Sequence, residues 1–141
     1  MKCNYFGNVS IASLILLATT AFAQSRVEAN VPFAFQVGTT TLPAGHYQVM
    51  EDHIRKTIIV SNLKTYETAQ RQVQQDVARD TARFKMVFHH FGNEYFLSEI
   101  HGSADTLDLT LPVTKEEKKL RSMQVASGPS NTPQAVEIAL K

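Results

Sequence analysis

The chain has 141 residues, of which 43 % are hydrophobic and 19 % are charged, with 14 Lys and Arg against 13 Asp and Glu. This length fits one domain of ordinary size and excludes two full domains. The composition is too apolar for a disordered chain. The nearly balanced charge gives no electrostatic reason to bind nucleic acid or an anionic membrane. We therefore expect a soluble folded domain that binds no nucleic acid.

The first 23 residues have the three parts of a secretory signal peptide. Lys2 provides a positive start, residues 11–18 form an apolar core, and Ala21-Phe22-Ala23 places small residues where a signal peptidase cleaves. The apolar stretch 9–23 is shorter than the ~20 residues that a membrane-spanning helix needs. We predict cleavage after Ala23, a mature chain of residues 24–141 in a single β domain without a membrane span, and a periplasmic or extracellular location.

Alternating apolar residues predict strands in the first part of the mature chain. Residues 31–37 alternate in this way, and Pro32 marks a strand start or an edge because it has no N–H to donate. The tripeptide Pro43-Ala44-Gly45 is typical of a turn. We predict that the chain reverses there and returns as a strand over residues 46–50.

The middle of the chain contains one clear strand and one ambiguous segment. Residues 57–61 are almost all β-branched, which favours a strand. In residues 66–82, Tyr66, Ala69, Val73 and Val77 fall near helical spacing, but the segment is also rich in Gln and Thr. Helix and strand both remain open for this segment.

A β-hairpin is predicted around the two-residue turn Gly92-Asn93. Antiparallel partners keep a constant sum of residue numbers. The predicted pairs are Phe91 with Glu94, Phe88 with Leu97, Met86 with Glu99, and Phe84 with His101. One face then carries Phe84, Met86, Phe88, Tyr95 and Leu97, together with Glu99 and His101.

A strand over residues 106–111 is predicted to end at Pro112. Thr114 and Glu117 have the spacing of a capping box, which predicts a short helix over residues 115–123.

The last segment combines a linker and a strand. Residues 127–133 have a linker composition, and the alternation over 136–140 predicts a final strand docked on the sheet. The predicted fold is all-β: an antiparallel sandwich or partly closed barrel of about seven to eight strands with one short C-terminal helix.

Three runs of this sequence resemble a family of small secreted β-rich proteins that are numerous in acidobacteria and have no assigned activity. They are NVPFAFQVG at residues 30–38, LPAGHYQV at 42–49, and MVFHHFGNEYFLSEI at 86–100. The resemblance covers about residues 30–121. It implies an exported β-rich domain and a strand rather than a helix around residues 66–73, and it supplies no activity, cofactor or catalytic residue.

Few side chains of this sequence are candidates for catalysis or metal binding. The only cysteine, Cys3, lies in the predicted signal peptide, which excludes thiolate catalysis, disulfides and cysteine metal sites from the mature chain. The remaining metal ligands are five histidines: His46, His53, His89, His90 and His101. Adjacent His89 and His90 point to opposite faces of a strand. Motifs of nucleophilic, phosphate-binding and zinc enzymes are also missing from the sequence. We expect no metal site, no cofactor and no enzymatic activity.

We expect an exported, non-enzymatic module that binds a small apolar ligand or an envelope protein. The alternative is a metal-dependent hydrolase that uses histidine and carboxylate. Under the predicted register, Glu99 and His101 lie on the apolar face, where an ionised carboxylate is costly unless it has a partner. Together with Tyr95, these residues are the candidate ligand-binding residues at the polar mouth of an apolar cavity.

Overall fold

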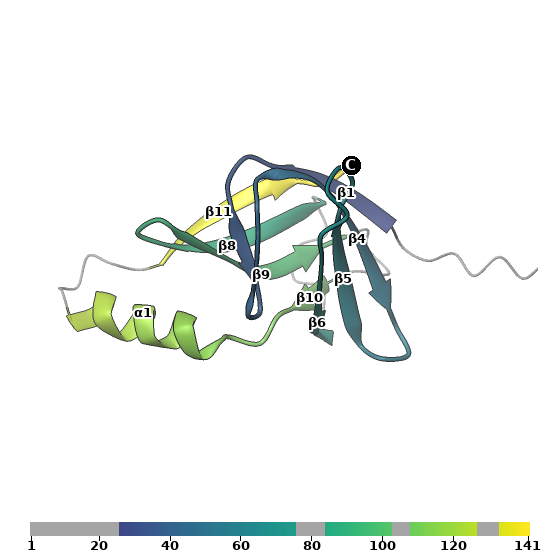
Figure 1. Ribbon diagram of the computed structural model, residues 1–141. Coiled ribbons are helices and arrows are strands. Elements are labelled where there is room, and N and C mark those ends of the chain that lie inside the picture. Colours follow the sequence, from purple (N-terminus) through teal and green to yellow (C-terminus); the bar gives the residue numbers. More distant parts are fainter. Residues whose placement is uncertain (1–25, 76–83, 103–107, 127–132) are drawn as a thin grey trace, which may run out of the picture.

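The computed structural model describes residues 26–75, 84–102, 108–126 and 133–141. Within these residues, eleven strands form two sheets, and one helix packs beside them (Figure 1). The predicted all-β sandwich is confirmed, and one of its sheets is curled into a half-barrel. The predicted signal peptide and most of the predicted linker 127–133 lie outside the described residues.

The four-stranded sheet is antiparallel, with strand order β1-β4-β5-β6. Its strands are β1 (Arg26–Val31), β4 (Gly45–Asp52), β5 (Thr57–Asn62) and β6 (Thr68–Gln72). Tyr47 and Val49 are buried on one face of β4, as alternation requires. Strand β6 shows that residues 68–72 of the ambiguous segment form a strand, in agreement with what the family resemblance implies, and residues 76–82 lie outside the described residues. Its backbone pairs with β5, and Ala69 is buried in the core.

The second sheet has the order β11-β8-β9-β10-β7. Its strands are β7 (Gln74–Gln75), β8 (Lys85–Phe91), β9 (Glu94–His101), β10 (Asp108–Thr110) and β11 (Gln134–Ala139). The predicted C-terminal strand is confirmed, because β11 pairs with β8 along its whole length. A small hairpin of β2 (Phe35–Val37) and β3 (Thr40–Leu42) joins this sheet through a parallel contact between β2 and β9.

Two predictions about the first part of the chain are wrong. Residues 31–37 do not form one strand, because β1 and β2 belong to different sheets and the chain breaks at Pro32. The reversal occurs at Gly38, whose φ of 64° suits a residue without a Cβ. The segment Pro43–Ala44 instead carries the chain from β3 to β4, in the other sheet. Such interruptions explain why there are more strands than the seven to eight expected.

The core fills the space between the sheets. Phe35 lies near its centre, with its ring 5.0 Å from that of Tyr47 and 5.3 Å from that of Phe88, both in edge-to-face geometry. The Tyr47 hydroxyl donates a hydrogen bond to the Pro43 carbonyl, which satisfies a buried polar group. The core of the sandwich thus combines apolar packing with a buried tyrosine whose hydroxyl is hydrogen-bonded.

One side of the sandwich is closed by the end of the chain. Leu140 forms a bridge with Ala29 of β1, and the backbones of Lys141 and Glu28 exchange two hydrogen bonds of 2.9 and 3.1 Å. Because β11, which directly precedes Leu140, pairs with β8, the segment 134–141 connects the two sheets. This closure matches the partly closed character expected from the sequence.

The helix α1 (Lys115–Ala126) begins where the capping box predicts and extends three residues beyond the predicted end. The backbone N–H of Glu117 donates to the Thr114 hydroxyl at 3.1 Å, which satisfies one of the free donors of the first turn. None of the described helices has the length and apolar character needed to cross a membrane.

Candidate binding site

The hairpin of β8 and β9 positions the candidate residues. Gly92 occupies the turn with a φ of 61°, Phe91 faces Glu94, and Phe88 faces Leu97, so the predicted turn and the first part of the register are confirmed. Between Phe88 and Val87, on the side of the hairpin away from the turn, the register shifts by one residue. Met86 therefore pairs with Ile100 rather than Glu99, and Lys85, not Phe84, pairs with His101.

The shift is a β-bulge, in which β9 contains one residue more than β8. The pairs on either side leave Ser98 without a partner on β8. As a consequence, Ile100 points into the core with Met86, and both are fully buried. The prediction that Glu99 and His101 share this apolar face is wrong. Both lie on the outer face of the sheet, because the extra residue in β9 shifts the alternation of the strand by one position.

Glu99 and His101 are nevertheless brought together on that outer face. The His101 Nε2 atom lies 2.8 Å from a Glu99 carboxylate oxygen, and its Nδ1 atom lies 3.0 Å from Asp108 on β10. Asp108 was not identified from the sequence, because β9 and β10 become neighbours only in the folded sheet. An imidazole can donate to both carboxylates when both of its nitrogens carry protons. This arrangement leaves neither nitrogen of His101 facing a ligand.

No group of three or more His, Cys, Asp or Glu side chains with the geometry of a metal site occurs in the described part of the chain. For the His101 cluster the geometry gives a reason, since a metal-bound imidazole needs one nitrogen lone pair directed at the ion. The cluster instead forms a hydrogen-bonded network across β9 and β10.

Tyr95 lies on the inward face near the hairpin turn, away from Glu99 and His101. Its ring is sandwiched between Phe33, at a centroid distance of 3.9 Å, and His90, at 4.3 Å, and both pairs are stacked with an interplanar angle of 16°. Both faces of the phenol ring are therefore occupied by other rings. The structure thus does not bring the three sequence-predicted residues together in one site.

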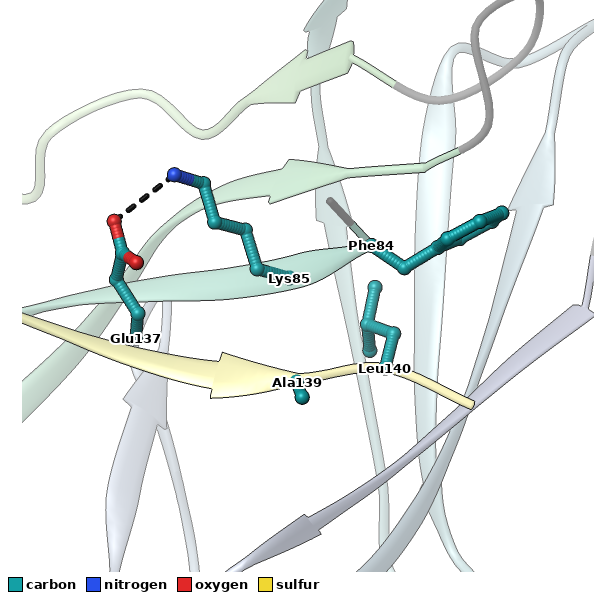
Figure 2. Close-up of a pocket in the computed structure, with 5 residues that line it drawn as sticks. All are labelled: Phe84, Lys85, Glu137, Ala139 and Leu140. Atoms are coloured by element: carbon teal, nitrogen blue, oxygen red, sulfur yellow. Dashed lines mark hydrogen bonds and ion pairs between the residues drawn. The ribbon is translucent and has the colours of Figure 1, made fainter. Parts of the chain in front are cut away.

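A pocket lies at the ends of β8 and β11 (Figure 2). Its apolar wall consists of Phe84, Ala139 and Leu140, and its volume is about 400 Å³. Phe84 is 48 % exposed, so the prediction that it belongs to the buried face of the hairpin is wrong. The backbone N–H of Leu140 donates to the Phe84 carbonyl at 2.9 Å, which holds the two sides of the pocket together.

An ion pair lies at the edge of the same pocket. The Lys85 ammonium contacts the Glu137 carboxylate at 2.9 Å, and Figure 2 shows this pair beside the apolar wall. The pocket combines an apolar body with a small number of polar groups, which is the composition of most small-molecule sites. Sequence reasoning missed it because β8 and β11 are far apart along the chain.

Glu51 is a second polar residue with an unusual environment. The strand predicted over residues 46–50 is longer in the structure, because β4 continues through Asp52, and Glu51 lies on the buried face at 8 % exposure. One carboxylate oxygen contacts Nδ1 of His53 at 3.1 Å, and the other has no hydrogen-bond partner. Burial raises the pKa of the Glu51 carboxyl above its ordinary value of 4.5, and His53 opposes this shift.

We expect Glu51→Leu to stabilise the protein by about 1–2 kcal/mol at pH 7, because it removes a buried carboxylate with an unpaired oxygen. The native state takes up a proton at a higher pH than the unfolded chain, since the folded pKa is raised. The native protein therefore regains stability relative to the variant as the pH falls from neutral through the raised pKa toward 4.5.

Urea unfolding at pH 7 and pH 5 measures this difference. Glu94→Leu is the matched control, because it makes the same substitution at an exposed position of the hairpin. A Glu51→Leu effect of the same size at both pH values would contradict the prediction.

Comparison with known proteins does not assign a family to the chain. No family model, curated protein or solved structure matches the chain. The resemblance to the secreted family therefore stays a prediction, and conclusions about function rest on the side chains described above.

Proposed function

We propose that the protein is an exported, non-enzymatic module that binds a small, largely apolar ligand in the pocket between Phe84 and Leu140. The observation that carries the proposal is this pocket of about 400 Å³ with an apolar wall and one ion pair at its edge. Its volume lies within the range of ligand sites, roughly 300–1,000 Å³. The apolar wall favours a ligand with a hydrocarbon or aromatic body.

The ion pair favours a ligand that also has a polar head group. Lys85 and Glu137 come from neighbouring strands, and the Lys85 side chain is 18 % exposed while that of Glu137 is 54 % exposed. A head group can therefore contact the pair from solvent while the apolar part of the ligand covers Ala139. Such convergent polar groups orient a ligand within an apolar site.

The alternative, a metal-dependent hydrolase, is less well supported. It requires a histidine with a free nitrogen near carboxylates and a substrate pocket. Both nitrogens of His101 face carboxylates, and His101 does not line the pocket at Phe84. These contacts support the binding module over the hydrolase.

Filling the pocket tests the proposed function. We expect Ala139→Phe to weaken binding of 8-anilinonaphthalene-1-sulfonate, a probe with an apolar body and an anionic head, by at least about tenfold, because the new ring occupies the ligand volume. The matched control is Ala135→Phe, which places the same ring on the same exposed face of β11 outside the pocket. Titration by fluorescence measures both, with near-UV circular dichroism to establish that each variant is folded.

Equal probe affinities for the two variants would show that the pocket is not the binding site. Native mass spectrometry of protein purified from its own host then provides the ligand itself, since a retained molecule adds its mass to the chain.

A separate experiment tests whether the chain is exported and cleaved after Ala23. We expect the full-length chain, expressed in a bacterium with a secretion pathway, to yield a mature protein that begins at Gln24. Intact-mass analysis of the exported fraction measures this start, and Ala23→Glu serves as the control that blocks cleavage because the peptidase requires a small residue there. An exported species that retains residues 14–17 would contradict the signal-peptide prediction.

A further inference from the structure

The two charged side chains at the edge of the pocket differ in their access to solvent. The Lys85 side chain is 18 % exposed, whereas that of Glu137 is 54 % exposed. The Lys85 ammonium donates to one oxygen of the Glu137 carboxylate, Oε1, and Figure 2 shows the other oxygen turned away from that ammonium. A carboxylate accepts about four hydrogen bonds through its two oxygens, so Glu137 retains acceptor sites for a second donor. The polar group that a ligand meets from solvent is therefore a carboxylate.

A second carboxylate lies on the same face of the sheet as Glu137. Val87 of β8 lies opposite Glu137 of β11 and also opposite Glu99 of β9. Directly opposed residues of antiparallel strands project from the same face. Neighbouring strands are ~4.8 Å apart, which puts the backbone of Glu99 roughly 10 Å from that of Glu137, about one Debye length at physiological ionic strength. Glu99 therefore adds to the negative potential beside the pocket.

The adjacent row of residues on this face brings in a third carboxylate. Lys85 lies opposite His101, and His101 lies opposite Asp108 of β10. Within the described strands, the two rows carry three carboxylates, those of Glu99, Asp108 and Glu137. Even when His101 is protonated, these carboxylates outnumber the positive groups by three to two. This part of the face is therefore negative in either protonation state of His101.

We propose that the ligand of the pocket is an amphipathic organic cation, an amine whose ammonium group donates to the Glu137 carboxylate. Its hydrocarbon or aromatic body covers Ala139 and contacts the apolar wall of Phe84 and Leu140. The inference rests on the proposed function, because it specifies the head group of the ligand that the pocket binds. An ammonium has donors and no acceptor, which complements the remaining acceptor sites of Glu137. An anionic head group instead meets like charge on the exposed side of the pocket.

Three ligands with the same alkyl chain and different head groups test the proposal. They are decylamine, decanol and decanoate, each used below its micelle-forming concentration. At pH 7 decylamine is a cation, since alkylammonium groups such as that of lysine have a pKa of about 10.4. Isothermal titration calorimetry measures their affinities for the full chain. We expect decylamine to bind about fivefold tighter than decanol, the size of effect for a partly exposed charge pair, and decanoate to bind more weakly than decanol.

Glu137→Gln separates the charge of this side chain from its shape. The variant keeps an oxygen that accepts from Lys85 and removes the negative charge. We expect the ratio of decylamine to decanol affinity to fall to about one. Binding of the anionic 8-anilinonaphthalene-1-sulfonate should become at least about twofold tighter, because its sulfonate no longer meets this carboxylate. Structural damage to the pocket would instead weaken both charged ligands. Glu94→Gln, at an exposed position of the hairpin turn, is the matched control and should leave the ratio unchanged.

The outcomes distinguish this inference from the proposed function. No binding of decanol, or binding that Ala139→Phe does not weaken, would overturn the proposed function and the inference with it. If Ala139→Phe weakens decanol binding, two results would overturn the inference alone. They are an affinity for decylamine no higher than for decanol, or a decylamine preference that Glu137→Gln leaves intact.

Discussion

Ile100→Glu is expected to destabilise the protein by at least ~4 kcal/mol. The bulge at Ser98 places Ile100 opposite Met86 in the core, so the substitution replaces a fully buried apolar side chain by a carboxylate. Loss of burial for an isoleucine costs about 1.5–3 kcal/mol. Burial of a carboxylate without a partner costs several kcal/mol more, even after protonation reduces the penalty. For a domain with a stability of about 5–15 kcal/mol, this loss approaches complete unfolding.

Ser98→Ala provides the control, because it changes a residue of the same strand and leaves the core side chain of Ile100 in place. It keeps the extra residue and the backbone hydrogen bond in which the Ser98 carbonyl accepts from the Leu111 N–H at 2.8 Å. Its expected cost is under about 1 kcal/mol. Denaturant unfolding of both variants measures the difference. Similar stabilities for Ile100→Glu and Ser98→Ala would mean that Ile100 does not face the core and that the bulge does not determine the faces of β9.

Phe88→Ala has the second largest expected effect, about 3–5 kcal/mol of destabilisation. Phe88 is fully buried, and its ring contacts Phe33 and Phe35 edge to face, each at 5.3 Å. Truncation therefore leaves a cavity between the sheets and removes two aromatic contacts. Thermal and denaturant unfolding both report the loss.

Phe84→Ala is the matched control, because it removes the same side chain four residues earlier on the same chain segment. Phe84 is 48 % exposed at the rim of the pocket. Its truncation is expected to cost less than about 1 kcal/mol. A comparable loss for both variants would contradict the assignment of Phe88 to the core and Phe84 to the surface.

Local patterns predicted much of this fold. The β-branched run gives β5, the Gly92-Asn93 turn gives the hairpin, and the capping box gives the start of α1. Each of these features depends on a few adjacent residues, whose backbone preferences are not overridden by packing.

The bulge had a signal in the sequence that the constant-sum rule overlooked. Leu97 and Ile100 are both apolar and three positions apart, and a regular strand places residues at that spacing on opposite faces. Both are buried in the same core, which requires one extra residue between them. The error in the predicted faces of Glu99 and His101 follows from this single position.

The pocket and the polar contacts could not be predicted in the same way. Phe84 meets Leu140, and His101 meets Asp108, only after strands pair. Sequence spacing does not specify which strands become neighbours, because each strand presents the same alternation to any partner. The buried position of Glu51 also depends on how far β4 extends, and helix or strand ends are poorly defined by local sequence.

The pairing of β11 with β8, together with the bridge from Leu140 to β1, has a consequence for the timing of folding. Ala29 and Leu140 form a bridge although they are more than 100 positions apart. Contacts between such distant segments slow folding, since a long loop must close before they stabilise the structure. A nascent chain emerging from the ribosome therefore leaves β1 and β8 without this neighbour until synthesis has reached residue 140.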